Sequence, residues 1–191
     1  MGVSMGKYQL LATAAMGLES IVAKEVRDLG YECKVDNGKI MFEGDERAIA
    51  RSNLWLRAAD RVKIIVGEFT ARTFDELFER TKALPWEQFI SVENEFPVSG
   101  KSVKSKLFSV PDCQAIVKKA IVERLKLKYK QSWFEEKGTK VPIEVSLLKD
   151  KATLTIDTSG IGLHKRGYRV GQGEAPLKET LAAALILLTN W

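Results

Sequence analysis

The chain has 191 residues, of which 45% are hydrophobic and 29% charged, and this composition predicts a globular protein with a sizeable core. It excludes collagen-like, low-complexity and membrane-spanning classes. The 30 basic and 25 acidic side chains leave a net charge of +5, which is unevenly distributed. Residues 1–100 hold 13 basic and 16 acidic side chains, residues 101–140 hold 11 basic and 4 acidic, and residues 141–191 hold 6 basic and 5 acidic. The positive excess therefore lies in one stretch of the chain.

The two cysteines, Cys33 and Cys113, and the one histidine, His164, are too few and too widely spaced for a structural zinc site, so we expect no metal. Two cysteines make no disulfide framework, which suits a reducing compartment. The longest apolar run, 181–188, is far shorter than the roughly 20 residues that cross a bilayer. We therefore expect a cytoplasmic protein without a membrane partner.

Residues 7–69 show apolar periodicity that predicts the order β-α-β-β-α-β, over residues 8–13, 18–29, 33–36, 39–43, 45–59 and 62–66. Gly30 ends the first helix, because glycine readily adopts the left-handed conformation of a helix stop. Asn37-Gly38 is typical of a two-residue hairpin turn, and Asp45 can cap the second helix. This order predicts a ferredoxin-like domain, a scaffold that hosts many functions.

Residues 70–161 predict a second α/β module. Its expected elements are a helix from Thr73 to Pro85, a longer helix from Ser109, and a hairpin of strands 143–147 and 152–156, with an irregular segment between the two helices. Thr73 and Glu76 form a capping-box pattern. The fold class is therefore α+β, and because no flexible linker separates the two modules we expect them to be packed together.

The basic stretch has one strongly charged helix face. Lys101, Lys104 and Lys106 precede the long helix, which carries Lys118, Lys119, Arg124, Lys126, Lys128 and Lys130 against Glu123. Such a one-sided array suits phosphate neutralisation in nucleic-acid binding, although a solvated helix face gives the same pattern. Trp133 and Phe134 follow this helix, and we expect them to complete a core rather than to stack on bases.

The segment after the second module, 162–169, is bracketed by glycines and holds His164, Lys165, Arg166 and Arg169. It can bind phosphate through side chains and backbone amides, or it can be a polar connector in which His164 has a structural rather than a catalytic role. The following helix, 177–188, is apolar nearly all round and must be buried by something. A further domain and a dimer interface both satisfy that requirement.

Three segments, KSKLFSVPDCQAIVKKAIVERL, GLHKRGYR and APLKETLAAALILLTNW, resemble the N-terminal part of the bacterial THUMP-containing RNA methyltransferases, in particular the large-subunit ribosomal RNA guanine-N2 methyltransferases. The resemblance implies a ferredoxin-like domain over 7–69 and an RNA-binding THUMP domain over 70–161. It makes 162–191 a linker and the first helix of a Rossmann-type domain that binds S-adenosylmethionine. That family's D-P-x-C-G-S-G and N-P-P-[YF] motifs are absent from these 191 residues, so we expect no cofactor, catalytic residue or methyl transfer in this chain alone.

The function that the resemblance implies is RNA binding, with ribosomal RNA as the partner. The residues expected to contact RNA are Lys101, Lys104, Lys106, Lys118, Lys119, Arg124, Lys126, Lys128, His164, Lys165, Arg166 and Arg169. Two alternatives remain at this point. The same front end could belong to another RNA-modifying enzyme with a THUMP domain, such as a tRNA thiolation enzyme or a pseudouridine synthase. Alternatively, the chain could be a non-enzymatic RNA-binding protein whose last helix forms a dimer.

Overall fold

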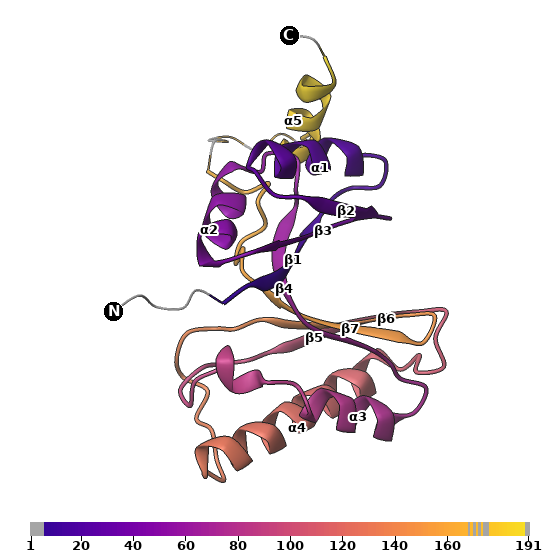
Figure 1. Ribbon diagram of the computed structural model, residues 1–191, viewed down its shortest axis with the longest axis vertical. Helices are drawn as coiled ribbons and strands as arrows, with labels where there is room; N and C mark the ends of the chain where they lie inside the picture. Colours follow the sequence, from indigo (N-terminus) through magenta and orange to yellow (C-terminus); the bar gives the residue numbers. More distant parts are fainter. Residues whose placement is uncertain (1–5, 168, 170, 172, 174–175, 190–191) are drawn as a thin grey trace. The chain divides into compact units, whose positions relative to one another are not determined.

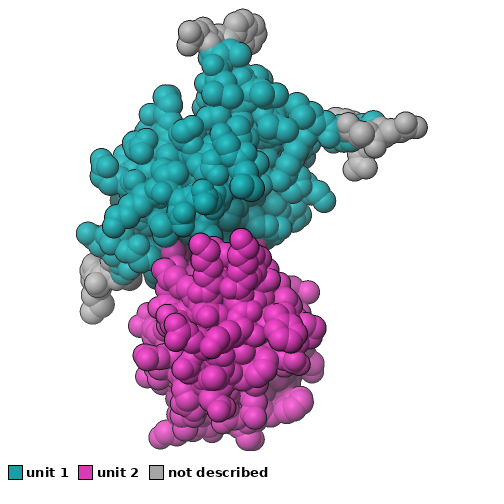
Figure 2. All heavy atoms as spheres, turned by 90° about the vertical axis from the view of Figure 1, so that its right-hand side faces the viewer, with its two compact units in different colours: residues 1–64, 158–191 teal, residues 65–157 magenta. Residues whose placement is uncertain are grey.

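The computed structural model describes residues 6–167, 169, 171, 173 and 176–189. They form two compact units, shown in Figure 2: unit 1 comprises the residues up to Ile64 and from Thr158 onward, and unit 2 comprises Ile65–Asp157. The chain leaves unit 1 within strand β4 (Arg61–Thr70) and returns to it after β7 (Lys151–Asp157). Unit 2 is therefore an insertion within the sequence of unit 1.

Unit 1 has strand order β2-β3-β1-β4 (Figure 1). Its other elements are β1 (Tyr8–Thr13), α1 (Glu19–Asp28), β2 (Cys33–Asp36), β3 (Lys39–Gly44), α2 (Glu46–Trp55) and α5 (Glu179–Leu188). Helix α1 packs against β2 and β3, and its Val22 and Val26 are fully buried. The predicted order of elements is confirmed, as are the hairpin that pairs Asp36 with Lys39 and the Asp45 cap, whose side chain accepts a hydrogen bond from Ala48 N.

Helix α2 ends at Trp55, four residues earlier than its apolar periodicity predicts. The next residue, Leu56, is extended, and the Glu25 carboxylate on α1 accepts hydrogen bonds from the backbone N–H groups of Arg57 (3.2 Å) and Ala58 (3.0 Å). These amides cannot then bond to carbonyls one turn earlier. Trp55, the last residue of the helix, is 66% exposed. Glu25 itself is only 6% exposed.

Unit 2 has strand order β4-β7-β6-β5, with α3 and α4 side by side on one face of the sheet (Figure 1). Its remaining elements are α3 (Phe74–Lys82), the short 3-10 helix η1 (Trp86–Gln88), β5 (Val98–Val103), α4 (Val110–Tyr129) and β6 (Ile143–Leu148). Trp86, Phe96 and Ile121 are fully buried between these layers. Strand β5 lies in the segment that was expected to be irregular, and it pairs in parallel with β6.

The start of α3 and the turn between β6 and β7 are both fixed by local geometry. The capping pattern before α3 is confirmed, because Thr73 Oγ1 accepts from Glu76 N at 3.2 Å and Glu76 Oε2 accepts from Arg72 N at 2.7 Å. The turn between β6 and β7 consists of Lys149 and Asp150, whose φ angles are 50° and 65°. Positive φ at both central residues is the geometry of a two-residue hairpin.

Helix α5 lies in unit 1 and contacts α1. Its Thr180 and Ala184 are buried, and the Thr180 hydroxyl donates to Asp60 Oδ1 at 2.9 Å. Leu185, Ile186 and Leu188 are about half exposed or more. The described part of the chain thus covers one side of this apolar helix.

Candidate nucleic-acid interface

Arg124, one of the predicted RNA contacts on α4, is joined to Glu87 on η1 by two hydrogen bonds. Its Nε lies 3.0 Å from Glu87 Oε2, and its Nη2 lies 2.6 Å from Oε1. The hydrogen bond from Arg124 lowers the pKa of Glu87 to about 2, and the same pairing raises the pKa of Arg124. The Glu87 side chain is only 14% exposed. Arg124 therefore connects α4 to η1 within unit 2.

Lys118 is also held by neighbours within unit 2. Its Nζ lies 2.6 Å from Glu136 Oε2, donates to Phe96 O at 3.0 Å, and lies 3.4 Å from the centroid of the Phe96 ring. Phe134 packs edge-on against the same ring, at a centroid distance of 6.5 Å. Lys118 thus links Glu136, in the loop after α4, to the core residue Phe96. The Lys118 side chain is 31% exposed.

The other predicted cations of the basic stretch are more accessible. Lys101 pairs with Glu144 at 2.9 Å, and Lys126 pairs with Glu123 at 3.1 Å. Exposed pairs of this kind contribute about 0–1 kcal/mol, so they can be exchanged for a phosphate at little cost. Lys119 and Lys128 are exposed, and Lys119 Nζ lies 5.9 Å from the Phe78 ring centroid.

Lys104 and Lys106 lie in the loop after β5, beside the β6–β7 turn. Lys106 N donates to Asp150 Oδ1 at 2.7 Å, and Lys149 N donates to Val103 O at 3.1 Å. Arg72 Nε lies 3.8 Å from the other carboxylate oxygen of Asp150. Asp150 therefore joins three segments of the chain, each of which carries at least one cationic residue. We define the tip surface as the four cationic residues of these segments together with Phe108, which follows Lys106 and Leu107 in the sequence. Its residues are Arg72, Lys104, Lys106, Phe108 and Lys149.

The tip surface combines unpaired charge with unusual backbone conformations. Among the residues that the structure describes, no acidic side chain forms an ion pair with Lys104, Lys106 or Lys149. Lys104 has a φ of 50°. Lys104, Lys149 and the adjoining Asp150 are three of the five non-glycine residues with positive φ among the residues that the structure describes. Left-handed backbone in such residues costs about 1–3 kcal/mol each and clusters at functional sites. The tip surface is therefore the candidate interface.

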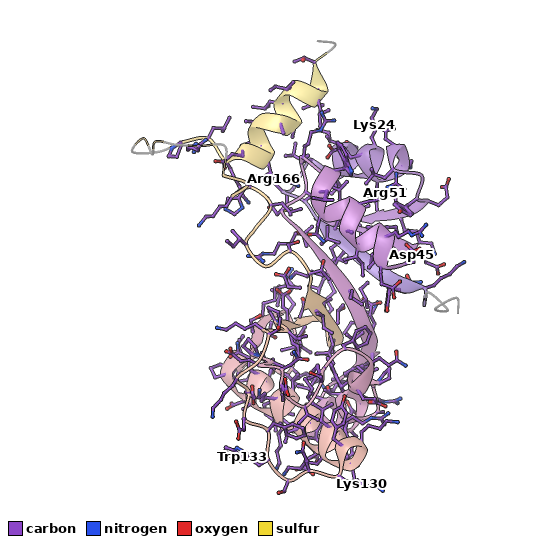
Figure 3. The ribbon with its side chains drawn as sticks, turned by 90° about the vertical axis from the view of Figure 1, so that its left-hand side faces the viewer. Lys24, Asp45, Arg51, Lys130, Trp133 and Arg166 are labelled. Atoms are coloured by element: carbon purple, nitrogen blue, oxygen red, sulfur yellow. The ribbon has the colours of Figure 1, made fainter. Side chains whose placement is uncertain are left out.

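The predicted contacts on α4 do not form one surface with the tip. The helix has 20 residues, which corresponds to a length of about 30 Å. The tip surface lies at its N-terminal end, whereas Lys126 and Lys128 lie near its C-terminal end, with Lys130 and Trp133 just beyond (Figure 3). Phe134 is buried as expected, but Trp133 is 77% exposed, so the expectation that it completes a core is wrong.

The predicted RNA contacts in residues 162–169 belong to unit 1. Among them, Arg166 binds backbone carbonyls at the C-terminal end of α2 (Figure 3). Its guanidinium donates to the carbonyls of Leu54, Leu56 and Leu163 at 2.8, 2.6 and 3.1 Å. Carbonyl groups at a helix C-terminus lack intrahelical donors and carry partial negative charge, so a guanidinium satisfies both needs. The hydrogen-bonding capacity of Arg166 is thus largely used inside unit 1.

His164, Lys165 and Arg169 line a cavity of about 550 Å³ together with Lys178 and Glu179. Arg169 Nε lies 3.4 Å from Glu179 Oε1, and Lys178 Nζ lies 2.7 Å from Asp60 Oδ1. His164 Nδ1 is buried without a hydrogen-bond partner in the described part of the chain. Lys165 and Arg169 are the exposed cations of this segment, whereas Arg166 is only partly exposed.

Sequence reasoning missed Arg72, Phe108 and Lys149. Phe108 stands between Lys106 and the N-cap residue Ser109, so the string K-S-K-L-F-S already contained an aromatic residue among cations. Arg72 and Lys149 are distant from this string in the sequence. They lie near the loop after β5 because β5 pairs with β6, a pairing that the sequence did not predict. Among the described residues, no cluster of three or more acidic, cysteine or histidine side chains could hold a metal ion. No helix in this part of the chain has the length and hydropathy of a membrane span.

Comparison with protein families matches residues 9–63 to the RlmL ferredoxin-like domain and residues 71–157 to the THUMP domain. The chain contains both domains. The resemblance found in the sequence, to the N-terminal part of the THUMP-containing RNA methyltransferases, is thereby confirmed for this pair of domains. In the structure, the THUMP match coincides with most of unit 2 and includes Arg72, Lys104, Lys106, Phe108 and Lys149.

Individual relatives agree with this assignment. The chain is 67% identical over 189 residues to YpsC of Bacillus subtilis (strain 168), whose name describes a proposed RNA methyltransferase; the match covers 98% of this chain and 49% of YpsC. A Listeria monocytogenes structure described as a predicted N6-adenine-specific DNA methylase has a TM-score of 0.95 at 67% identity, covering 97% and 49% of the two chains. SMU.472, described as a proposed methyltransferase in complex with SAH, has a TM-score of 0.93 at 52% identity, covering 99% and 50%. The chain thus spans about half the length of these relatives.

Proposed function

We propose that this chain is the RNA-binding front end of an S-adenosylmethionine-dependent RNA methyltransferase that acts on guanine N2 of large-subunit ribosomal RNA in the cytoplasm. The observation that carries RNA binding is the tip surface of the THUMP domain, which combines four cationic residues from three segments with one exposed aromatic side chain. Relatives described as methyltransferases, one of them bound to SAH, support the reaction class over thiolation or pseudouridylation.

S-adenosylmethionine supplies the methyl group in this proposal. The D-P-x-C-G-S-G and N-P-P-[YF] motifs do not occur in these 191 residues, so the chain has no recognisable loop for the cofactor. Its own contribution is to hold the RNA through phosphate contacts, which give affinity that decreases as salt increases. Arg124, Lys118 and Arg166 contribute by keeping the domains folded.

RNA binding is tested by reversing the charge of Lys104, Lys106 and Lys149 to Glu and measuring the affinity for a ribosomal RNA fragment at several salt concentrations. Affinity decreases with salt, and each lost phosphate contact makes the slope of log K against log salt less negative by about 0.7. The three substitutions should therefore make the slope less negative by about 2. The matched control reverses Lys24, Lys137 and Lys7, which are exposed and lie outside the tip surface. Equal weakening by both triple variants would show that only net charge matters.

The reaction class is tested in the whole protein that contains this chain, with S-adenosylmethionine carrying a labelled methyl group. We expect label on guanine in large-subunit ribosomal RNA, reduced by the three tip substitutions at subsaturating RNA. Label found on adenine, or on DNA alone as the description of the Listeria relative suggests, would contradict the proposal. The 191-residue chain by itself should transfer no label.

A further inference from the structure

Phe108 is the most exposed aromatic side chain in the described part of the chain, at 82% exposure. It immediately precedes Ser109, the N-cap residue of α4. An apolar residue at this position ordinarily packs against the fourth residue of the helix, which here is Cys113. Cys113 is 1% exposed, but the neighbour that fills the core beside it is Leu107, at 5% exposure. Within the described part of the chain, Phe108 therefore does not pack into the core as a residue at this position ordinarily does.

The surroundings of Phe108 are both apolar and cationic. Val103 and Leu148, which pair across β5 and β6, are 50% and 46% exposed. Lys106 is two residues from Phe108, so their Cα atoms are at most about 7 Å apart. Because the intervening Leu107 is turned into the core, the lysine and the phenyl ring are both left on the solvent side.

We propose that Phe108 stacks on an unpaired RNA base while Lys104, Lys106 and Lys149 hold the neighbouring phosphates, so that the tip surface selects single-stranded RNA. A phenyl ring stacks on a base only when the face of that base is free. Within an A-form duplex the bases are stacked on one another, so their faces are covered, and the duplex offers mainly its phosphates, its 2′-hydroxyls and the base edges in its shallow minor groove. This inference rests on the proposed RNA-binding function and adds the form of RNA that is bound.

The other highly exposed aromatic residue of unit 2, Trp133, has different surroundings. It lines a cavity of about 380 Å³ with Glu93 and Glu135, and the one lysine there, Lys137, is paired with Glu135 at 3.1 Å. Acidic side chains repel the phosphates that accompany every stacked base. Trp133 is thus a matched control for Phe108: it is an exposed aromatic residue of the same unit, and its cavity is lined by two acidic side chains and one lysine that is paired with one of them.

The experiment measures the affinity of the 191-residue chain for a single-stranded RNA oligonucleotide and for a blunt RNA duplex of the same length. Loss of one stacked base should weaken single-strand binding about 5- to 100-fold in Phe108→Ala and leave duplex binding unchanged. Phe108→Trp should restore the single-strand affinity, and Trp133→Ala should have no effect. Because Phe108 is exposed, its variants should keep the unfolding midpoint of the parent chain, which circular dichroism checks.

The inference is overturned if Phe108→Ala binds the single strand as tightly as the parent chain, or if it weakens duplex binding by the same factor. If charge reversal at Lys104, Lys106 and Lys149 still reduces binding in that case, the proposed RNA-binding function stands and only the stacking is rejected. If neither the phenylalanine nor the lysine variants alter affinity for any RNA, both proposals fail.

Discussion

Arg124 and Glu87 form a two-point ion pair in which the shorter hydrogen bond, from Nη2 to Oε1, measures 2.6 Å. Both residues are only partly exposed, and their planar groups match each other's geometry. The helix with the highest local density of lysine thus uses its only arginine to fix the position of η1. We therefore expect the pair to stabilise unit 2 in a pH-dependent way.

Glu87→Gln should lower the free energy of unfolding at pH 7 by about 1–3 kcal/mol, because it removes a charged hydrogen-bond partner of Arg124. The folded-state pKa of Glu87 is lowered to about 2 from an ordinary value near 4.5. Its contribution is therefore fully present above pH 4.5 and is lost as the pH falls towards 2. Urea unfolding of both proteins between pH 7 and pH 2.5 should show their difference shrinking over this window. A difference independent of pH would contradict the assignment.

Arg166→Lys should lower the free energy of unfolding by about 1–2 kcal/mol while keeping the net charge. A lysine offers one ammonium group and cannot reach the carbonyls of Leu54, Leu56 and Leu163 together. Thermal unfolding measures the loss, with Lys165→Arg as a control of equal charge in the same segment. RNA affinity should stay within experimental error of the parent, since the guanidinium faces the end of α2; a marked loss of affinity at unchanged stability would place RNA there instead.

Glu25→Ala should destabilise unit 1 by about 2–4 kcal/mol, because it leaves the backbone N–H groups of Arg57 and Ala58 without an acceptor. Glu25→Gln keeps one acceptor oxygen and should be less damaging. Urea unfolding followed by tryptophan fluorescence gives both values. The comparison variant is Asp28→Ala on the same helix, whose carboxylate is 62% exposed and pairs with Lys24; it should change stability by no more than about 0.5 kcal/mol.

Lys149→Gly should move stability and RNA binding in opposite directions. Glycine adopts the φ of 50° without strain, and the relief exceeds its added entropy cost by up to about 1 kcal/mol, so the melting temperature should rise. The lost ammonium group should reduce the salt dependence of RNA binding by about one phosphate contact. Calorimetry and a salt titration measure the two effects. A variant that binds RNA as well as the parent would show that the lysine serves only the turn.

The sequence predicted those features that depend on neighbours along the chain. The caps at Asp45 and Thr73 and the hairpin at Asn37-Gly38 follow from local chemistry, and all three are present. The end of α2 did not follow, because the buried acceptor that terminates it, Glu25, lies on another helix. A periodic pattern carries no information about such a partner.

The candidate interface shows the same division. Charge density along residues 101–140 predicted a basic region, and two of its residues, Lys104 and Lys106, lie in the tip surface. It could not separate Lys118 and Arg124 from the accessible cations, because their partners Glu136 and Glu87 come from segments on either side of the helix. It also could not bring Arg72 and Lys149 to the loop, since that requires the register of β5 and β6.

The insertion of unit 2 within unit 1 sets the order in which a nascent chain can fold. Unit 1 needs residues on both sides of the insertion: Thr158 N and its hydroxyl both donate to Val62 O, and Arg166 completes the end of α2. During synthesis from the N-terminus, all of unit 2 emerges from the ribosome before those residues do. We therefore expect the THUMP domain to fold first, whereas the ferredoxin-like domain can complete its folding only after the residues from Thr158 onward have emerged.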